Sequence, residues 1–259
     1  MYWWQISNNA RWKAYKNIMG FISFMQSIFC KDHLRIISTL ESNIATLTAK
    51  LIGQMDPKEE YYNNKYPKVN LKYNRKETDG QYNIDLRNFF NLNDATIPIV
   101  DGDSDDSKAV NGLKWVINNI TYTSDDSEST YKAGEYWAYP YQTLKHRAGD
   151  CEDMSILLAN ILIKSGIPYW KVRLMAGDVV GGGHCYVTYY DATNDRWVLL
   201  DCCYNANTKN ISDRKDYKEE ASYKTVWFSW NRDFCFSNEK SLVANDYFKI
   251  KKISKGGIK

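Results

Sequence analysis

One cysteine of this chain stands where a polar loop gives way to a long apolar run. The stretch HRAGDCEDMSILLANILIKSGIP, residues 146–168, predicts a buried helix that begins near Cys151 and ends at Gly166 and Pro168. The first turn of a helix offers unpaired backbone N–H groups and the positive end of the helix dipole, and both favour a thiolate. The position therefore indicates a nucleophilic thiol, since a cysteine needed only for packing would be more typical deeper in the helix.

Carboxylates surround this cysteine in the sequence. Gly149 and Asp150 can end the loop and cap the helix, and Asp153 can complete an arrangement similar to a capping box. The negative charges of Asp150, Glu152 and Asp153 would raise the pKa of the thiol. We therefore expect a cationic group close to Cys151 in the folded chain.

Histidine is scarce in this sequence, and one of the three follows a run of glycines. His184 opens the predicted strand HCYVTYY, and the predicted strand RWVLLDCC returns after the turn segment DATN. If the strands pair across a two-residue turn at Ala192 and Thr193, His184 and Asp201 face each other with Cβ atoms about 4.5 to 5.5 Å apart. Asp201 could then hold one ring nitrogen while the other nitrogen accepts the proton of Cys151.

These three residues match the nucleophile, general base and orienting group of thiol hydrolases. A zinc site is the competing use of the same residue types, with Cys151, His184, Cys185, Cys202 and Cys203 as its ligands. No CxxC or HxxxH spacing supports it, and neighbouring strand residues such as Cys202 and Cys203 point to opposite faces. Six cysteines in 259 residues are also too sparse for a disulfide scaffold, which favours free thiols.

The elements that must position these residues are readable from the same sequence. The C-terminal third alternates short aromatic and β-branched runs with turn-forming stretches, which predicts antiparallel strands. Acidic residues at 101–106 precede an apolar pattern at 110–120, which predicts a helix with an acidic first turn. Asp101, Asp103 and Asp105 also imitate the first ligands of a calcium-binding loop, but the glycine and the distal glutamate of an EF-hand are missing. Helix capping is therefore the favoured interpretation.

The first 96 residues differ from the rest of the chain. Residues 37–51 place apolar side chains at spacings of three and four, which predicts an amphipathic helix that ends at Gly53. Together with the aromatic segment before it, this helix leads us to interpret residues 1–55 as an N-terminal helical docking segment for a protein partner or for self-association. Residues 56–96 are rich in lysine, asparagine and tyrosine and are interpreted as a connecting region, and residues 97–259 as one α+β domain.

Charge and hydropathy limit the classes of partner. Lys and Arg total 34 against 31 Asp and Glu, so the balance predicts neither nucleic acid nor membrane as an obligatory partner. The apolar stretch at 18–29 is too short to span a bilayer and lacks a small-residue cleavage site. We therefore expect synthesis in the cytoplasm without a secretory signal. The five lysines of the tail at 249–259 favour a solvated end over a binding patch.

Four segments of the sequence carry a resemblance to a known family. They are LKWVINNITYTSD, YWAYPYQTLKHRAGDCEDMSILLANILIKSGIP, GGGHCYV and RWVLLDCCYN, which lie between residues 113 and 205, and the resemblance covers about residues 97–236. In these segments the sequence resembles the transglutaminase-like superfamily, and most of all its bacterial cysteine proteinases and their phage-encoded relatives. The resemblance implies a papain-like α+β fold, in which a central helix with the nucleophile packs on an antiparallel sheet with the base.

The resemblance also implies roles for individual residues. Cys151 is the expected nucleophile, His184 the general base and Asp201 the orienting residue, with the backbone N–H of Cys151 as one oxyanion donor. Trp137 and Gly183 are expected to line the substrate cleft, although Trp137 could instead pack under the cysteine loop. The chemistry requires no cofactor. In some of these proteinases the acids around the cysteine bind calcium, and the matching residues here are Asp150, Glu152 and Asp153.

The expected function is therefore a thiol-dependent hydrolase that cleaves peptide or side-chain amide bonds of a protein or peptide substrate through a thioester intermediate. Transfer of the acyl group to a lysine amine would make the same site a crosslinking transglutaminase. The alternative from a different class is that the protein is a structural or assembly component, for example of a phage particle. It would carry such a domain and be incorporated into the virion. Free-standing activity would favour the hydrolase, and strict dependence on assembly would favour the structural component.

Overall fold

The computed structural model describes residues 56–77, 80–127, 135–237 and 242–243, together with Asn17, Gly20 and Leu40. The chain divides into two compact units, Met1–Pro57 and Lys58–Lys259, and the second unit holds every residue of the predicted site. The predicted docking segment at 1–55 lies outside the described residues except for the three single positions, which are helical. The lysine-rich tail also lies outside them.

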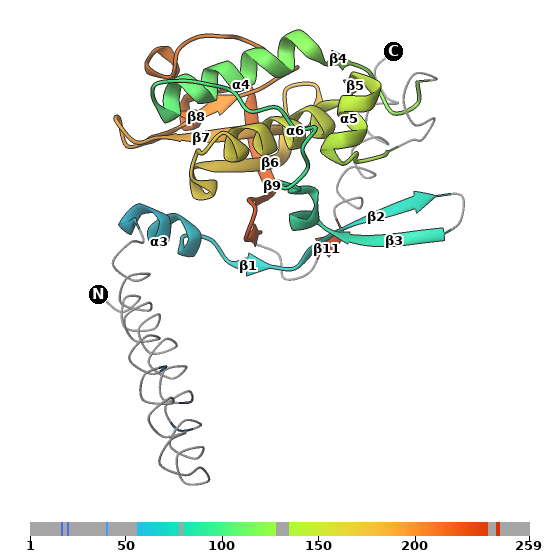
Figure 1. Ribbon diagram of the computed structural model, residues 1–259, viewed down its shortest axis with the longest axis horizontal. Helices are drawn as coiled ribbons and strands as arrows, with labels where there is room; N and C mark the ends of the chain where they lie inside the picture. The colour runs from blue at the N-terminus through green and yellow to red at the C-terminus, as the bar shows by residue number, and fades with distance from the viewer. Residues whose placement is uncertain are drawn as a thin grey trace. The chain divides into compact units, whose positions relative to one another are not determined.

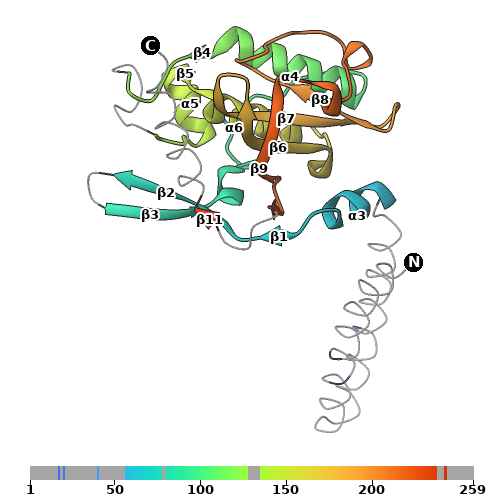
Figure 2. The ribbon, with the colours of Figure 1, turned by 180° about the vertical axis from the view of Figure 1, so that it is seen from behind.

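An antiparallel sheet of six strands organises the second unit (Figure 1). All neighbouring strands of this sheet run antiparallel, as the alternating runs of the C-terminal third predicted. Figure 2 shows the same sheet from behind. From one edge to the other its strands are β1 (Lys68–Val69), β10 (Cys235–Phe236), β9 (Tyr223–Trp230), β6 (Val172–Val179), β7 (Gly182–Asp191) and β8 (Arg196–Leu200).

The cysteine-bearing helix α6 (Cys151–Lys164) packs on β6 and β7. Its side chains are buried from Cys151 to Ile163, because its sequence is apolar around almost its whole circumference. Each large aliphatic side chain buried here contributes about 1.5 to 3 kcal/mol to folding. The helix ends as predicted, since Gly166 adopts a φ of +95° and its N–H donates to the carbonyl of Ile163. The α+β fold class is thereby confirmed, with the cysteine helix on an antiparallel sheet.

Two further helices pack on α6 (Figure 1). They are α4 (Asp105–Asn119) and α5 (Pro140–His146). Ser104 caps α4 through a capping box with Ser107, and the acids that follow it occupy the first turn, so the capping interpretation is confirmed. A Cβ atom on Gly112 would lie 2.5 Å from the side chain of Leu162, so glycine permits the close approach of α4 and α6.

The region at 56–96, interpreted from composition as a connection, forms regular elements. It contains α3 (Pro57–Asn64), β1, β2 (Leu71–Glu77), β3 (Gly80–Asp85) and the 3-10 helix η1 (Leu86–Phe89). β2 pairs antiparallel with β3 and parallel with β11 (Leu242–Val243), while β1 forms an edge of the large sheet. Tyr73 and Phe89 are fully buried, so aromatic side chains supply core contacts in this region. The scarcity of aliphatic residues in its sequence gave no indication of these contacts.

The remaining described elements are short connections. Residues Thr121–Tyr122 (β4) pair in parallel with Ala148–Gly149 (β5), just before the cysteine helix. The other 3-10 helices are η2 (Tyr169–Lys171), η3 (Ile211–Asp213) and η4 (Tyr217–Glu219). Within the part of the chain that the structure describes, no helix combines the length and the hydropathy needed to span a bilayer.

The pairing of β7 with β8 differs from the predicted register. Val187 pairs with Leu200 and Asp191 pairs with Arg196, so the turn contains the four residues 192–195 and not two. The predicted pairing is therefore wrong by two residues, and Asp201 does not lie directly opposite His184. Because side chains alternate with a period of two, a displacement of two residues keeps both side chains on the same face. His184 and Asp201 are therefore close to each other even though the predicted register is wrong.

Candidate active site

Cys151 is the first residue of α6, and the backbone before it is held by strand pairing. The backbone N–H of Thr123 donates to the carbonyl of Gly149, which fixes the approach to the helix. Asp150 is the N-cap, but its side chain makes no capping hydrogen bond. A Cβ atom on Gly149 would lie 2.6 Å from Cβ of Asp153, so glycine is required at this crossing. The Cys151 side chain is held at the helix start and is 9% exposed.

The thiol of Cys151 lies in an acidic and buried environment. Its Sγ donates a hydrogen bond to Oε2 of Glu152 at 3.1 Å. Burial, followed by the charge of Asp150 and by the neighbouring thiols of Cys185 and Cys203, raises the pKa of Cys151 well above its ordinary value. A hydrogen bond from the backbone of Cys185 acts in the opposite direction. The resting side chain is therefore a neutral thiol, which agrees with the expected effect of the surrounding carboxylates.

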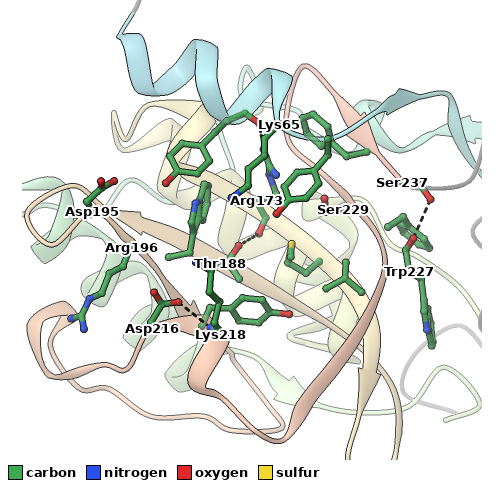
Figure 3. Close-up of a pocket in the computed structure, with 18 residues that line it drawn as sticks. Lys65, Arg173, Thr188, Asp195, Arg196, Asp216, Lys218, Trp227, Ser229 and Ser237 are labelled. Carbon is green, nitrogen blue, oxygen red and sulfur yellow. Dashed lines mark hydrogen bonds between the residues drawn. The ribbon is translucent and has the colours of Figure 1, made fainter. Parts of the chain in front are cut away.

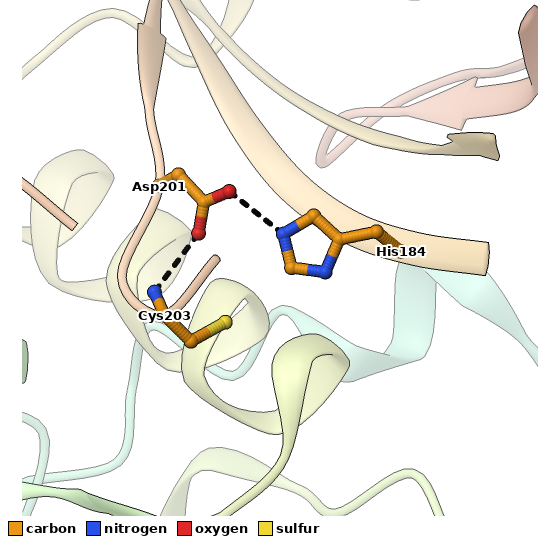
Figure 4. A group of neighbouring side chains, drawn as sticks. All are labelled: His184, Asp201 and Cys203. Carbon is orange, nitrogen blue, oxygen red and sulfur yellow. Dashed lines mark hydrogen bonds and ion pairs between the residues drawn. The ribbon is translucent and has the colours of Figure 1, made fainter. Parts of the chain in front are cut away.

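His184 and Asp201 form a buried pair (Figure 4). Nε2 of His184 lies 2.7 Å from Oδ2 of Asp201, and the two side chains are 7% and 0% exposed. Asp201 also accepts hydrogen bonds from the backbone N–H groups of Cys203 and Tyr204 and from the hydroxyl of Tyr223 at 2.5 Å. Burial opposes the charge of this carboxylate, but these hydrogen bonds, led by that of His184, hold the pKa of Asp201 below its ordinary value.

An ionised Asp201 fixes the tautomer of the imidazole. Since a carboxylate only accepts hydrogen bonds, Nε2 of His184 carries the hydrogen and donates it to Oδ2. Nδ1 is then the basic nitrogen of the neutral ring. The rings of Tyr186, Tyr204 and Tyr223 lie 5.8, 5.4 and 6.4 Å from the imidazole and enclose it. The pair is thus oriented for Nδ1 to accept a proton.

The structure brings the predicted residues together in two groups. The thiol of Cys151 contacts the backbone of Cys185, which directly follows His184. Its hydrogen bond goes to Glu152, however, and among the described residues no hydrogen bond joins it to the imidazole. The second group places Sγ of Cys203 within 4.8 Å of ligand atoms of His184 and Asp201 (Figure 4).

Two residues beside the histidine–aspartate pair were given no part in the hydrolase site from the sequence, although Cys203 was considered as a zinc ligand. Tyr223 is a hydrogen-bond donor to Asp201, and Cys203 is a second thiol beside the imidazole. Tyr223 begins β9, whose place next to β6 and not next to β8 is set by the sheet order, so no local spacing could have indicated it. Cys203 could have been found, because it follows Asp201 by two residues and therefore lies close to any partner of that carboxylate.

The zinc alternative is not supported by the positions of its ligands. Cys151, His184, Cys185, Cys202 and Cys203 do not form one cluster among the residues that the structure describes. Sγ of Cys202 instead donates toward the carbonyl of Met154 inside the core, at 3.9 Å. All five cysteines within the described ranges are free thiols, as predicted.

A cluster of carboxylates lies beside the cysteine. Ligand oxygens of Asp125, Asp150 and Asp153 lie within 4.8 Å of one another, and Asp150 also groups with Cys151 and Glu152. Asp153 accepts a 2.7 Å hydrogen bond from the backbone of Ala138 through Oδ1 and another from the backbone of Asp150, which is half of the predicted capping box. Its Oδ2 is buried without a hydrogen-bond partner, and so is Oε1 of Glu152.

Burial, followed by the charge of Asp150, raises the pKa of both Glu152 and Asp153 well above their ordinary values. Buried oxygens that lack hydrogen bonds, gathered from several carboxylates, are the kind of donor set that a hard cation such as calcium prefers. The residues therefore fit the implied calcium ion, and Asp125 joins the three acids named from the sequence.

The two expected cleft residues lie in different surroundings. Trp137 is fully buried, with its ring stacked on Tyr73 at 5.1 Å and on Trp230 at 5.7 Å, so it packs in the core and does not line an open cleft. This result corrects the cleft assignment in favour of the packing alternative. Gly183 is half-buried, and a Cβ atom there would lie 2.7 Å from the Trp227 ring, so its small size is required by that contact. Its place in a cleft stays a prediction.

A buried helix that starts with a cysteine, packed on an antiparallel sheet with a histidine–aspartate pair, is an arrangement suited to thiol-dependent enzymes. Comparison with known families agrees with this class. Residues 94–202 match the family described as the transglutaminase-like superfamily. The sequence resemblance is thereby confirmed. Among functionally curated proteins, no sequence matches this chain.

Several solved structures are similar to this chain. Legionella pneumophila LapG, EGTA-treated, is 17% identical with a TM-score of 0.41, and the match covers 51% of this chain and 66% of that one. Calcium-bound LapG from the same organism is 19% identical with a TM-score of 0.40, and the coverage is 56% and 78%. A putative cysteine protease from Cytophaga hutchinsonii is 18% identical with a TM-score of 0.27, and the coverage is 52% and 46%.

Proposed function

We propose that this protein is a cysteine-dependent hydrolase that cleaves peptide or side-chain amide bonds in protein substrates. Cys151 is the nucleophile, His184 the general base and Asp201 the residue that orients it. The observation that carries the proposal is the 2.7 Å contact between Nε2 of His184 and Oδ2 of Asp201, on a strand whose next residue, Cys185, contacts the Cys151 thiol. The match of residues 94–202 to the transglutaminase-like superfamily supports an enzyme in general.

The reaction follows from this geometry. Nδ1 of His184 accepts the thiol proton as Sγ of Cys151 attacks the amide carbonyl carbon, and the carbonyl oxygen becomes an oxyanion. The backbone N–H of Cys151 can donate to that oxyanion, because the first N–H groups of a helix have no acceptor within the helix. The imidazolium then protonates the departing amine, which leaves a thioester on Cys151. Water, deprotonated by the same imidazole, hydrolyses the thioester and restores the thiol.

The acidic cluster opposes the first step. Burial and, after it, the charge of Asp150 raise the pKa of Cys151, and Glu152 holds the thiol by a hydrogen bond. Asp125, Asp150, Glu152 and Asp153 would hold a calcium ion, whose positive charge would offset their negative charges. The Cys151 thiol would then lose the part of the penalty for ionisation that the charge of Asp150 imposes, and it could turn from Glu152 toward the imidazole.

Calcium is expected to stabilise the fold, and the effect is expected to depend on pH. Folding raises the pKa values of Glu152 and Asp153. Their protonated forms therefore stabilise the folded state fully at pH values below the unfolded pKa. This stabilisation is lost as the pH rises through the folded pKa. Without divalent cations, the melting temperature should fall as pH rises from about 5 to 8. The lowered pKa of Asp201 affects stability only at lower pH, below its ordinary value near 3.8.

Saturating calcium at neutral pH should raise the melting temperature by about 5 to 10 °C, the shift expected when the ligand is at about a hundred times its Kd. Differential scanning calorimetry of the full chain, with EGTA and with calcium, measures both effects. Asp125→Asn should lose most of the calcium shift, whereas Asp126→Asn, at the exposed neighbouring position, should keep it. An equal shift in both variants would contradict the assignment of Asp125.

A substrate-free experiment tests the proposed nucleophile. The purified protein is treated with iodoacetamide in calcium over a series of pH values, and the alkylated cysteines are located by mass spectrometry. Cys151 should be labelled first below about pH 7, because only an activated thiol is ionised there. His184→Ala should abolish this preference, and His146→Ala, at an exposed position, should retain it. If Cys151 reacts no faster than the other cysteines in the wild type, the proposed function is wrong.

Hydrolysis and crosslinking share this triad and differ only in the acceptor of the acyl group. Casein, an unfolded protein with many accessible amides, is incubated with the enzyme and a fluorescent primary amine. The proposed hydrolase should generate new α-amino termini or free ammonia without incorporating the amine. Incorporation of the amine at glutamine side chains would instead identify acyl transfer as the reaction.

A further inference from the structure

A cavity lies on the face of the six-stranded sheet away from α6. It has a volume of about 230 Å³. Arg173, Met175, Thr188 and Trp197 line it and alternate along their strands with core residues such as Val187, which places them on the opposite face. Tyr62, Lys65 and Tyr66, from α3 and the segment after it, border it together with Tyr217 and Lys218 from η4 (Figure 3).

Arg173 brings a buried positive charge to this cavity. The residue is 3% exposed, and its Nη2 donates to the carbonyl of Tyr62 at 3.0 Å. Its guanidinium carbon lies 4.3 Å from the centre of the Phe236 ring and 5.4 Å from that of Trp197. Nε has no hydrogen-bond partner, and no ion pair joins Arg173 to a carboxylate within the described part of the chain. A buried cation with rings but no anion beside it is incompletely compensated.

The other charged groups of the cavity do not supply that anion. Asp195 is held by Lys58 at 2.7 Å, and Asp216 accepts the backbone N–H of Lys218 as the N-cap of η4. Lys65, by contrast, adds a second cation, 5.6 Å from the centre of the Tyr66 ring. Burial lowers the pKa of Arg173 to about 10, which leaves the guanidinium charged at neutral pH. The cavity therefore combines an excess of positive charge with flat apolar walls.

We propose that this cavity binds a small aromatic monocarboxylate. The planar guanidinium of Arg173 can donate to a planar carboxylate, and the rings of Trp197, Tyr66 and Phe236 can flank an aromatic body. The volume lies below the roughly 300 to 1,000 Å³ of pockets for drug-sized ligands, so a ligand with one ring fits best. A single negative charge is favoured over a dianion because the carboxylates of Asp195 and Asp216 lie at the same cavity.

Titration of the full-length protein with 3-phenylpropionate and with its neutral amide tests the proposal by isothermal titration calorimetry. The acid should bind saturably at millimolar concentrations or below, and the amide at least about tenfold more weakly, because loss of a charge-assisted pair costs about 1.5 to 3 kcal/mol. Lack of saturable binding of the acid, or equal binding of acid and amide, would overturn the proposal. Tighter binding of inorganic phosphate would overturn the choice of a carboxylate.

Variants locate the site. Arg173→Gln should weaken binding of the acid at least tenfold and leave binding of the amide unchanged, whereas a merely structural role for Arg173 would weaken both equally. The double variant Lys65→Met/Lys218→Met changes only exposed side chains and should weaken binding of the acid about threefold even if Arg173→Gln fails to fold. Lys215→Met, exposed and outside the cavity, is the matched control. Unchanged affinity in the double variant would contradict the site.

The carboxylate could belong to a free acid or to the C-terminus of a peptide. N-acetyl-Ala-Phe and its C-terminal amide distinguish these sources. Binding of the peptide acid as tightly as 3-phenylpropionate would identify a peptide terminus, and binding of the free acid alone would identify a small metabolite. None of these measurements depends on turnover, so the proposal stands or falls independently of the role of Cys151.

Discussion

Cys151→Ser should lower kcat/KM for casein hydrolysis by about 10⁴- to 10⁶-fold, the range seen when a covalent nucleophile is removed. Serine preserves the shape of the site, but a hydroxyl ionises far less readily than a thiol. The imidazole would have to remove a much less acidic proton at a site where burial and the charge of Asp150 already raise the pKa of the native thiol. The rate of appearance of new amino groups measures the loss.

Cys203→Ser is the informative control for that variant. Sγ of Cys203 lies within 4.8 Å of ligand atoms of His184 and Asp201, whereas the Cys151 thiol contacts the backbone of the neighbouring Cys185, and Cys203 is the more exposed of the two. Burial and the charge of Asp201 raise the pKa of Cys203, and its position after β8 gives it no helix N-terminus to stabilise a thiolate. Cys203→Ser should therefore retain at least about a third of the wild-type activity. Loss of activity in Cys203→Ser with retention in Cys151→Ser would reassign the nucleophile.

Asp201→Asn should lower kcat/KM by about 10² to 10⁴-fold with the fold retained. The asparagine carbonyl can still accept from the backbone N–H groups of Cys203 and Tyr204. Its NH₂ group would then face Nε2 of His184 as a donor, so the imidazole would carry its hydrogen on Nδ1. In that tautomer Nδ1 cannot accept the thiol proton. The iodoacetamide reactivity of Cys151 should fall together with the turnover.

Tyr223→Phe is the matched conservative change for this effect. It removes one donor to Asp201 but leaves the carboxylate and the tautomer of His184 in place. Loss of one hydrogen bond of about 1 kcal/mol corresponds to a decrease in activity of about three- to tenfold. Circular dichroism and melting temperature establish that both variants are folded. Equal losses in Tyr223→Phe and Asp201→Asn would show that the tautomer of the imidazole is not what Asp201 controls.

Local patterns in the sequence were sufficient to predict the main elements. The apolar circumference of residues 151–164 and the glycine at 166 predicted the buried helix and its end, because helix burial and termination depend on neighbouring residues. The acids at 101–106 predicted the start of α4 for the same reason. Alternating runs predicted antiparallel strands, and the family resemblance predicted which three residues would do the chemistry.

The register of β7 and β8 depended on a side-chain contact in the turn that the alternation of the strands does not reveal. Two turn residues and four turn residues both fit the segment DATN, and Asp191 decides between them by accepting hydrogen bonds from the backbone N–H groups of Thr193 and Asn194. Because the predicted register was wrong by two residues, it still placed Asp201 on the same face of the sheet as His184. An error of one residue would have separated it from His184.

Sequence by itself determined the helix that presents Cys151, the succession of strands along the chain, and the chemical types of the three residues proposed as nucleophile, base and orienting group. Only the tertiary structure decided what surrounds them. Asp125 reaches the acidic cluster and Tyr223 reaches Asp201 because β4 pairs with β5 and β9 pairs with β6, contacts between segments far apart in the chain. The cavity around Arg173 arises in the same way. Long-range pairings of this kind depend on how whole elements pack, and no spacing of residues within one element encodes them.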